Sequence, residues 1–201
     1  MIVTVTLNPS LDEWVHVPRL QVGHLHRTSV FHRYPAGKGI NVSRVVHELG
    51  GRTTAVALAG GADGQILGTL LAQQGIPHRF VDVAGTTRNN YQIQTDRPPA
   101  VTQINGAGPR VSARELAALA TLLGRLQRTA RCVVLSGSLP PGAPPHTYAS
   151  LIRGLRASRG LTVLDTSGAA LRQGLPARPW LIKPNRAEAE ELLGRRLRRR
   201  R

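Results

Sequence analysis

The residues best suited to chemistry begin with a short turn flanked by glycines, Gly37-Lys38-Gly39, which is followed by Asn41. Apolar residues then recur at helical spacing, so the turn opens a predicted helix over residues 40–49. A helix N-terminus presents free backbone N–H groups and the positive end of the helix dipole, and Lys38 adds a cation beside them. The turn therefore suits an anion or a cluster of hydroxyls, although glycines that only let the chain turn explain the pattern equally well.

The predicted helix is amphipathic, because one set of apolar residues falls at i, i+3, i+4 and i+7. These residues are Val42, Val45, Val46 and Leu49. The glycine pattern before them is not a common nucleotide-binding motif. A Walker A loop would need glycine in place of His32 and a hydroxyl residue in place of Gly39.

Two further charged residues stand at the ends of predicted strands. Asp12 follows the first apolar run, residues 2–7, and open α/β sheets bind ligands beyond the carboxyl ends of their strands. A turn-stabilising aspartate is the alternative. Arg88 opens a later strand and has the geometry for a bidentate phosphate contact, although it is also one arginine among many.

A third candidate region lies at the start of the last predicted helix. Asn185 and Glu188 are three residues apart there and share one helix face, which suits a hydrated Mg²⁺ ion. Asn185 is equally suited to be a plain helix cap. Lys183 precedes them, and it and Lys38 are the only lysines in the chain.

The composition narrows the class of protein. The 201 residues suffice for one domain, and the net charge of +16 comes almost entirely from arginine, six of them within residues 195–201. The few aromatic residues do not form a base-stacking platform, so specific nucleic-acid binding is not expected. No run is long enough to span a membrane, and the single Cys132 forms no internal disulfide, so we expect a cytoplasmic protein.

Strand, turn and helix patterns alternate along the chain, which predicts an α/β fold with a mostly parallel sheet. Two stretches break this rhythm, because they contain strand patterns without helices between them. They lie within residues 13–34 and 86–105, and we expect them to form a small antiparallel appendage over one edge.

Six short motifs, in order along residues 1–194, make the chain resemble the ribokinase-like (phosphofructokinase B type) sugar kinases. The resemblance is strongest to the branch of 1-phosphofructokinases and tagatose-6-phosphate kinases. Each motif is weak alone, but all six in register are a strong signal. The motifs cover residues 6–12, 36–42, 87–90, 104–106, 136–140 and 183–188.

The resemblance implies a ribokinase-like domain with a small β-sheet lid, at about residues 12–35 and 86–106, which often pairs two subunits into a homodimer. It implies transfer of the γ-phosphoryl group of ATP to a ketohexose phosphate, either fructose 1-phosphate or tagatose 6-phosphate. The residues implied on the sugar-phosphate side are Asp12, Gly37, Lys38, Gly39, Asn41, Arg88, Asn90 and Asn105. The residues implied on the ATP–Mg²⁺ side are Lys183, Asn185 and Glu188, the last two as metal ligands.

The chain also departs from the family pattern. It lacks the Gly-Ala-Gly-Asp motif that supplies the anion hole and the catalytic base, so no catalytic residue is assigned, and about the last third of the fold is expected to be missing. Asp63 and Asp165 lie near strand ends, but no motif supports either as the base. We expect residues 195–201 to match nothing in the family and to be disordered.

Two hypotheses therefore remain. In the first, the chain descends from a sugar-phosphate kinase and is shortened, with impaired activity. In the second, it is a non-catalytic protein that binds sugar phosphates, or polyanions through its arginine tail.

Overall fold

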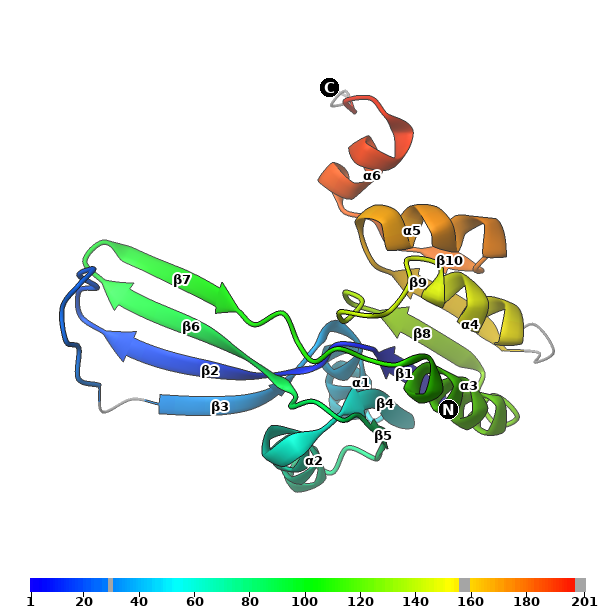
Figure 1. The fold of residues 1–201 in the computed structure, drawn as a ribbon, viewed down its shortest axis with the longest axis horizontal. Coiled ribbons are helices and arrows are strands. Elements are labelled where there is room, and N and C mark those ends of the chain that lie inside the picture. The colour runs from blue at the N-terminus through cyan, green and yellow to red at the C-terminus, as the bar shows by residue number, and fades with distance from the viewer. Residues whose placement is uncertain (29–30, 156–159, 198–201) are drawn as a thin grey trace.

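A six-stranded parallel sheet forms the centre of the protein. The structure, a computed structural model, describes residues 1–28, 31–155 and 160–197. Every neighbouring pair in this sheet runs parallel, which confirms the mostly parallel α/β fold predicted from the alternating pattern (Figure 1). Its strands, in sheet order, are β10 (Leu181–Ile182), β9 (Leu161–Asp165), β8 (Cys132–Ser136), β1 (Ile2–Thr6), β4 (Thr53–Ala59) and β5 (His78–Asp82).

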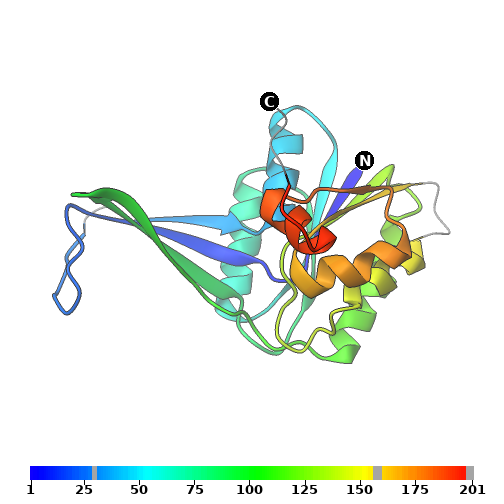
Figure 2. The same cartoon turned by 90° about the horizontal axis from the view of Figure 1, so that it is seen from above.

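Helices cover both faces of this sheet, and each face has its own hydrophobic core. One core lies between the sheet and α3 (Ala113–Leu126), α4 (Thr147–Leu155) and α5 (Gly168–Gly174), and its buried members include Leu119 and Tyr148. The other lies against α1 (Lys38–Glu48) and α2 (Gly61–Gln73), with Ile40 and Leu67 fully buried. Figure 2 shows the two groups of helices on opposite sides of the strands. A short 3-10 helix η1 (Leu175–Ala177) and the terminal α6 (Arg186–Leu193) follow α5.

A second sheet, which we call the lid sheet, projects from this body (Figure 1). Its strand order is β3-β2-β6-β7, formed by β3 (Phe31–Ala36), β2 (Ser10–Val17), β6 (Arg88–Asp96) and β7 (Pro99–Asn105). The outer pairs are antiparallel, but the central pair β2–β6 is parallel. The prediction of an antiparallel appendage is thus wrong at its centre. The reason is that β2 and β6 both leave the body outward, one after β1 and the other after β5.

The buried face of α1 differs from the apolar stripe that the sequence pattern predicted. Val45 is 53% exposed and Leu49 is 82% exposed, whereas Gly39, Ile40 and Ser43 lie against the sheet. The helix packs so closely on the sheet that small and hydroxyl-bearing residues line the contact. Of the predicted stripe, Val45 and Leu49 are left toward solvent, and Val42 and Val46 are partly buried.

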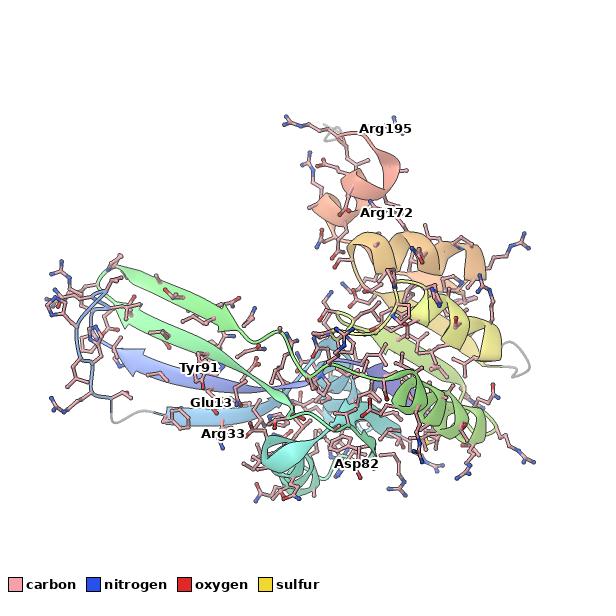
Figure 3. The ribbon with its side chains drawn as sticks, in the orientation of Figure 1. Glu13, Arg33, Asp82, Tyr91, Arg172 and Arg195 are labelled. Atoms are coloured by element: carbon pink, nitrogen blue, oxygen red, sulfur yellow. The ribbon has the colours of Figure 1, made fainter. Side chains whose placement is uncertain are left out.

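Charged pairs tie some of the peripheral elements together. In the lid sheet, Arg33 on β3 donates to the carboxylate of Glu13 on β2 at 2.7 Å, and Glu13 is nearly buried (Figure 3). Arg172 on α5 pairs with Glu191 on α6 at 3.0 Å. No helix in the described part of the chain is long and apolar enough to cross a membrane.

Candidate functional site

The turn before α1 is shaped by close contact with β1. Gly37 has φ 126° and is the N-cap of α1, and an added Cβ there would lie 2.6 Å from Thr6 Cγ2. A Cβ on Gly39 would lie 2.6 Å from Thr6 Oγ1. The backbone N–H groups of Lys38 and Gly39 belong to the first turn of the helix, where no intrahelical acceptor exists. The two glycines therefore allow a close approach of the turn to β1, and the N–H groups of Lys38 and Gly39 have no acceptor within the helix.

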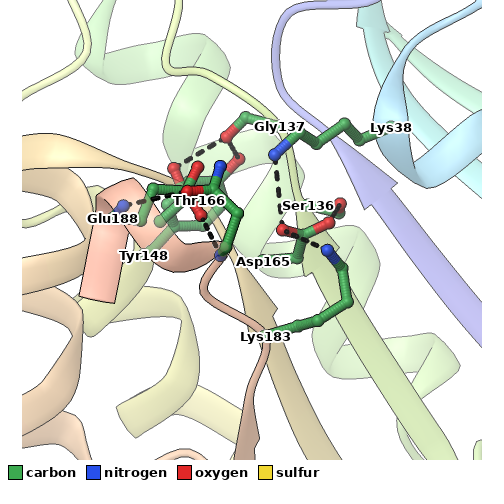
Figure 4. A network of polar contacts seen from close by, with 9 residues as sticks. Lys38, Ser136, Gly137, Tyr148, Asp165, Thr166, Lys183 and Glu188 are labelled. Atoms are coloured by element: carbon green, nitrogen blue, oxygen red, sulfur yellow. Dashed lines mark hydrogen bonds and ion pairs between the residues drawn. The ribbon is translucent and has the colours of Figure 1, made fainter. Parts of the chain in front are cut away.

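Both lysines of the chain meet at one carboxylate. Lys38 Nζ lies 3.3 Å from Asp165 Oδ1, and Lys183 Nζ lies 3.6 Å from the same oxygen (Figure 4). The second oxygen, Oδ2, accepts a hydrogen bond of 3.2 Å from Ser136 Oγ. We call Lys38, Ser136, Asp165 and Lys183 the Asp165 cluster. It lies at the carboxyl ends of β8 and β9, the edge at which open α/β sheets bind ligands.

A buried network of hydrogen bonds around Gly137 lies next to the Asp165 cluster. The carbonyl of Gly137 accepts hydrogen bonds from Tyr148 Oη at 3.0 Å and from Thr166 Oγ1 at 2.8 Å. The N–H of Gly137 donates to the carbonyl of Asp165 at 2.9 Å. Burial, and secondly the charge of Asp165, raise the pKa of Tyr148 far above its usual range, so this hydroxyl remains a donor. The network therefore fixes the loop after β8 against the end of β9.

The second group of candidate residues lies where the lid sheet joins the body. Asp12 Oδ1 accepts from Ser10 Oγ at 3.0 Å and from Asn90 Nδ2 at 2.9 Å. Asn90 Oδ1 is buried and has no hydrogen-bond partner among the described residues. Asn105 pairs with Asn90 across β6 and β7 but is exposed. Asp12 and Asn90 therefore form a polar pair with an unused buried acceptor, to which a ligand hydroxyl could donate.

Arg88 binds backbone carbonyls at the same junction. Its Nη1 donates to Gly106 O at 2.9 Å and its Nη2 to Asn8 O at 3.0 Å. Burial lowers the pKa of Arg88, and the charge of Asp12 opposes that shift. The Nε atom is buried without a hydrogen-bond partner in the described chain. Arg88 is therefore a half-buried cation that still has donor capacity for an anion.

A cavity of about 430 Å³ opens between the lid sheet and α1. The resemblance implied that Asp12 and Asn41 both contact the sugar phosphate, and both line this cavity. Its volume falls within the usual range for small-molecule sites. Aromatic and basic side chains complete much of the wall, namely Trp14, His16, His32, Tyr34 and Arg44.

Asn185 and Glu188 are used as a helix cap in this structure. Glu188 N donates to Asn185 Oδ1 at 2.9 Å, and Asn185 N donates to Glu188 Oε2 at 2.8 Å, which closes a capping box at the start of α6. This is the capping alternative stated above. No group of three or more metal-ligating side chains is found among the described residues. Because Mg²⁺ keeps several waters and needs few protein oxygens, the pair retains enough oxygen atoms for one water-mediated contact.

The sequence did not identify Asp165 as the meeting point of the two lysines. Lys38 and Asp165 are separated by 127 positions in the sequence, so no local pattern links them. The available signals were that Asp165 directly ends a buried strand and that the chain has only two lysines. The supporting roles of Tyr148 and Thr166 had no sequence signal, because a buried hydroxyl looks like any other core residue.

Comparison with known proteins places these residues in a family context. A family profile described as pfkB family carbohydrate kinase matches residues 5–200. The expectation that residues 195–201 match nothing in the family is therefore wrong up to residue 200. Of those residues, 195–197 belong to the described chain, and the N–H of Leu197 donates to Glu190 Oε1 at 2.9 Å. Residues 198–201 lie outside the described residues.

The similar curated proteins are longer than this chain. It is 39% identical over 194 residues to a 1-phosphofructokinase of Bacillus subtilis, covering 96% of this chain and 63% of that protein. It is 37% identical over 196 residues to a 1-phosphofructokinase of Vibrio cholerae, covering 98% of this chain and 62% of that protein. The chain thus spans less than two thirds of the length of these relatives.

Solved structures show the same fold. Phosphofructokinase-2 from Escherichia coli in complex with fructose-6-phosphate superposes with a TM-score of 0.93 at 32% identity, covering 98% of this chain and 65% of that chain. The tetrameric inhibited form of the same enzyme gives a TM-score of 0.92 at the same identity and coverage. A possible 1-phosphofructokinase from Thermotoga maritima gives 0.85 at 32% identity, covering 92% of this chain and 60% of that chain.

Proposed function

Because the chain belongs to the pfkB family of carbohydrate kinases, we propose that it forms the sugar-phosphate-binding part of a kinase that transfers the γ-phosphoryl group of ATP to a ketohexose phosphate. Fructose 1-phosphate is the first candidate substrate, since curated relatives are named 1-phosphofructokinase, and tagatose 6-phosphate is the second. The observation that carries the proposal is the meeting of Lys38 and Lys183 at Asp165. Lys38 lies on the same helix, α1, as Asn41, which lines the cavity together with Asp12.

The proposed chemistry is an in-line displacement at phosphorus. A sugar hydroxyl oxygen forms the new O–P bond, the bond to the ADP oxygen breaks, and the hydroxyl proton passes to a base. Catalysis of this kind depends on holding the reactants in line and on neutralising phosphoryl charge. Lys38 and Lys183 are close enough to one carboxylate oxygen to hold a phosphoryl group between them, and the first-turn N–H groups of α1 add donors.

The remaining residues divide between the two reactants. Asp12, with Asn90 beside it, accepts hydrogen bonds from sugar hydroxyls, and Arg88 and Lys38 favour a substrate that already carries a phosphate. Gly37 and Gly39 allow the sugar to approach the backbone, and Asn41 and Asn105 supply further amide groups. Lys183 faces the ATP phosphates, and Asn185 and Glu188 contact the hydrated Mg²⁺ that accompanies ATP.

Two other features of the proposal follow from the lid sheet and the location of the substrates. Three large apolar side chains on one face of the lid sheet, Phe31, Tyr91 and Ile104, are between 42% and 55% exposed, which favours pairing of two copies through this face. ATP and sugar phosphates are cytoplasmic metabolites, so we place the protein in the cytoplasm.

The chain lacks the Gly-Ala-Gly-Asp motif, and among the described residues no carboxylate takes the place of the base by motif. We therefore expect the 201-residue chain to bind sugar phosphate while turning it over slowly or not at all.

Calorimetric titration of the 201-residue chain with fructose 1-phosphate tests the proposal. Tagatose 6-phosphate is the second ligand and unphosphorylated fructose the negative control. We expect Lys38→Gln to weaken binding by about tenfold or more, since it removes a charge-assisted contact. Arg125→Gln, which removes an exposed charge from α3, should leave the affinity unchanged. Absence of binding by the unaltered chain, or equal effects of the two substitutions, would overturn the proposal.

A further inference from the structure

A series of buried hydroxyls joins α1 to the sheet. Thr4 Oγ1 on β1 lies 2.7 Å from Ser43 Oγ on α1, and Ser43 Oγ lies 2.8 Å from Thr53 Oγ1 on β4. One turn earlier, the N–H of Ile40 donates to Thr6 Oγ1 at 3.1 Å. The hydroxyl residues are at most 4% exposed. Polar contacts therefore hold this helix on the sheet at two points, where apolar packing would be usual.

Thr6 differs from the other hydroxyl residues in what it contacts. Its Oγ1 satisfies an N–H group of the first helical turn, which has no acceptor within the helix. Its Cγ2 and Oγ1 fill the space beside Gly37 and Gly39, since a Cβ on either glycine would lie 2.6 Å from one of these two atoms. The turn that carries Lys38 thus rests directly on the Thr6 side chain.

The position of Lys38 depends on this contact. Lys38 lies between the two glycines, and its ammonium reaches Asp165 at 3.3 Å. A shift of the turn moves the Lys38 ammonium and the first-turn N–H groups together, because both belong to the first turn of α1. Interactions with a phosphate lose strength steeply when a donor is displaced or misaligned.

We propose that Thr6 is a positioning residue for phosphate-bearing ligands. Its hydroxyl sets the placement of Lys38 and of the first-turn N–H groups, without touching the ligand itself. This inference rests on the proposed function for its ligand, but the anchoring of the helix start is a property of the chain alone and can be measured separately.

The Ser43 contacts provide a matched control. Thr53→Val removes a buried hydroxyl that also bonds to α1, but it acts one turn away from Lys38. Thr6→Val removes the acceptor of the Ile40 N–H and keeps the side-chain volume. If Thr6 had only a structural role, both substitutions would lower stability, and they would change the ligand affinity by the same amount.

The first experiment is calorimetric titration of each variant with fructose 1-phosphate. We expect Thr6→Val to weaken binding by about tenfold, comparable with the loss of one good hydrogen bond, and Thr53→Val to leave it within the error. Thr6→Ser, which keeps the oxygen and removes only the methyl group, should restore most of the affinity. Equal affinities for Thr6→Val and Thr53→Val, or no restoration by serine, would overturn the inference.

The second experiment needs no ligand. Amide hydrogen exchange should be faster at residues 39–41 in Thr6→Val than in the unaltered chain, and unchanged there in Thr53→Val. If Thr6→Val does not fold, Thr6→Ser and Thr6→Ala are compared in the same way, and equal exchange in these two refutes the anchoring role. If the unaltered chain binds no sugar phosphate while the exchange result holds, the proposed function fails and the anchor stands. If the unaltered chain binds sugar phosphate but the exchange at residues 39–41 is the same in Thr6→Val, the anchoring role of Thr6 fails and the proposed function stands.

Discussion

The shared carbonyl of Gly137 allows a quantitative test of the network beneath the Asp165 cluster. Tyr148→Phe and Thr166→Val each remove one of the two donors to this carbonyl, at 3.0 and 2.8 Å, from positions that are at most 2% exposed. After either single change the carbonyl keeps one donor. We therefore expect each substitution to lower the free energy of unfolding by about 1 kcal/mol, the net value of one hydrogen bond.

The double variant removes both donors and leaves a buried carbonyl unsatisfied. That state costs about 1–3 kcal/mol beyond the hydrogen bonds themselves. The loss in the double variant should therefore exceed the sum of the single losses by about 1 kcal/mol or more. The interaction energy is positive because the two hydroxyls serve the same acceptor.

Urea-induced unfolding of the four proteins, followed by far-ultraviolet circular dichroism, measures this cycle. Thr121→Val is the matched control, since Thr121 Oγ1 makes a similar hydrogen bond of 3.0 Å to Ala117 O on the exposed face of α3. It should change the unfolding free energy by less than about 0.5 kcal/mol. If the two losses add within about 0.3 kcal/mol, the reasoning about the shared carbonyl is wrong.

Two further predictions concern helix caps. The Ser112 hydrogen bonds and the Ala84 N–H hold the pKa of Glu115 below its usual range. Glu115→Gln should therefore lower the melting temperature at pH 7, and the difference should shrink as the pH falls through the carboxyl pKa, as measured by thermal scans between pH 7 and pH 3. Asn185→Ala removes the cap of α6, a helix with no buried residues. We expect it to lower the local stability of this helix by about 1 kcal/mol, without changing the stability of the rest of the protein. Hydrogen exchange should speed up within residues 186–193 while the urea midpoint stays unchanged, and a shift of that midpoint would contradict this.

The sequence predicted the parts of the fold that local patterns determine. The alternation of strands and helices predicted the parallel sheet. The spacing Ser112-x-x-Glu115 is a capping-box pattern, and the structure contains that box at the start of α3. Residues 168–177, in contrast, form α5 and η1 without a sequence pattern that predicts them. Their small and apolar residues show no clear periodicity over so few turns.

The failures share a physical cause, which is that long-range contacts override local pattern. Periodicity placed Val45 and Leu49 on the apolar stripe of α1, but close approach to β1 required Gly39 and Ser43 at the contact instead. The parallel pairing of β2 with β6 joins residues about 78 positions apart, as in the Asn90–Asp12 contact. The joint role of the two lysines likewise appears only when α1 and the end of β9 are brought together.

The way in which the lid sheet is attached to the body has a mechanical consequence. The lid sheet is joined to the body by four chain links at one edge, after β1, before α1, before β6 and after β7, and Arg88 bridges two of them through Gly106 O and Asn8 O. Because all four links lie at one edge of the lid sheet, we expect the lid sheet to bend relative to the body mainly about that edge. An anion that draws Arg88 from its two carbonyls would loosen that clamp at the moment of binding, so ligand capture and the stiffness of the flap are linked through one side chain.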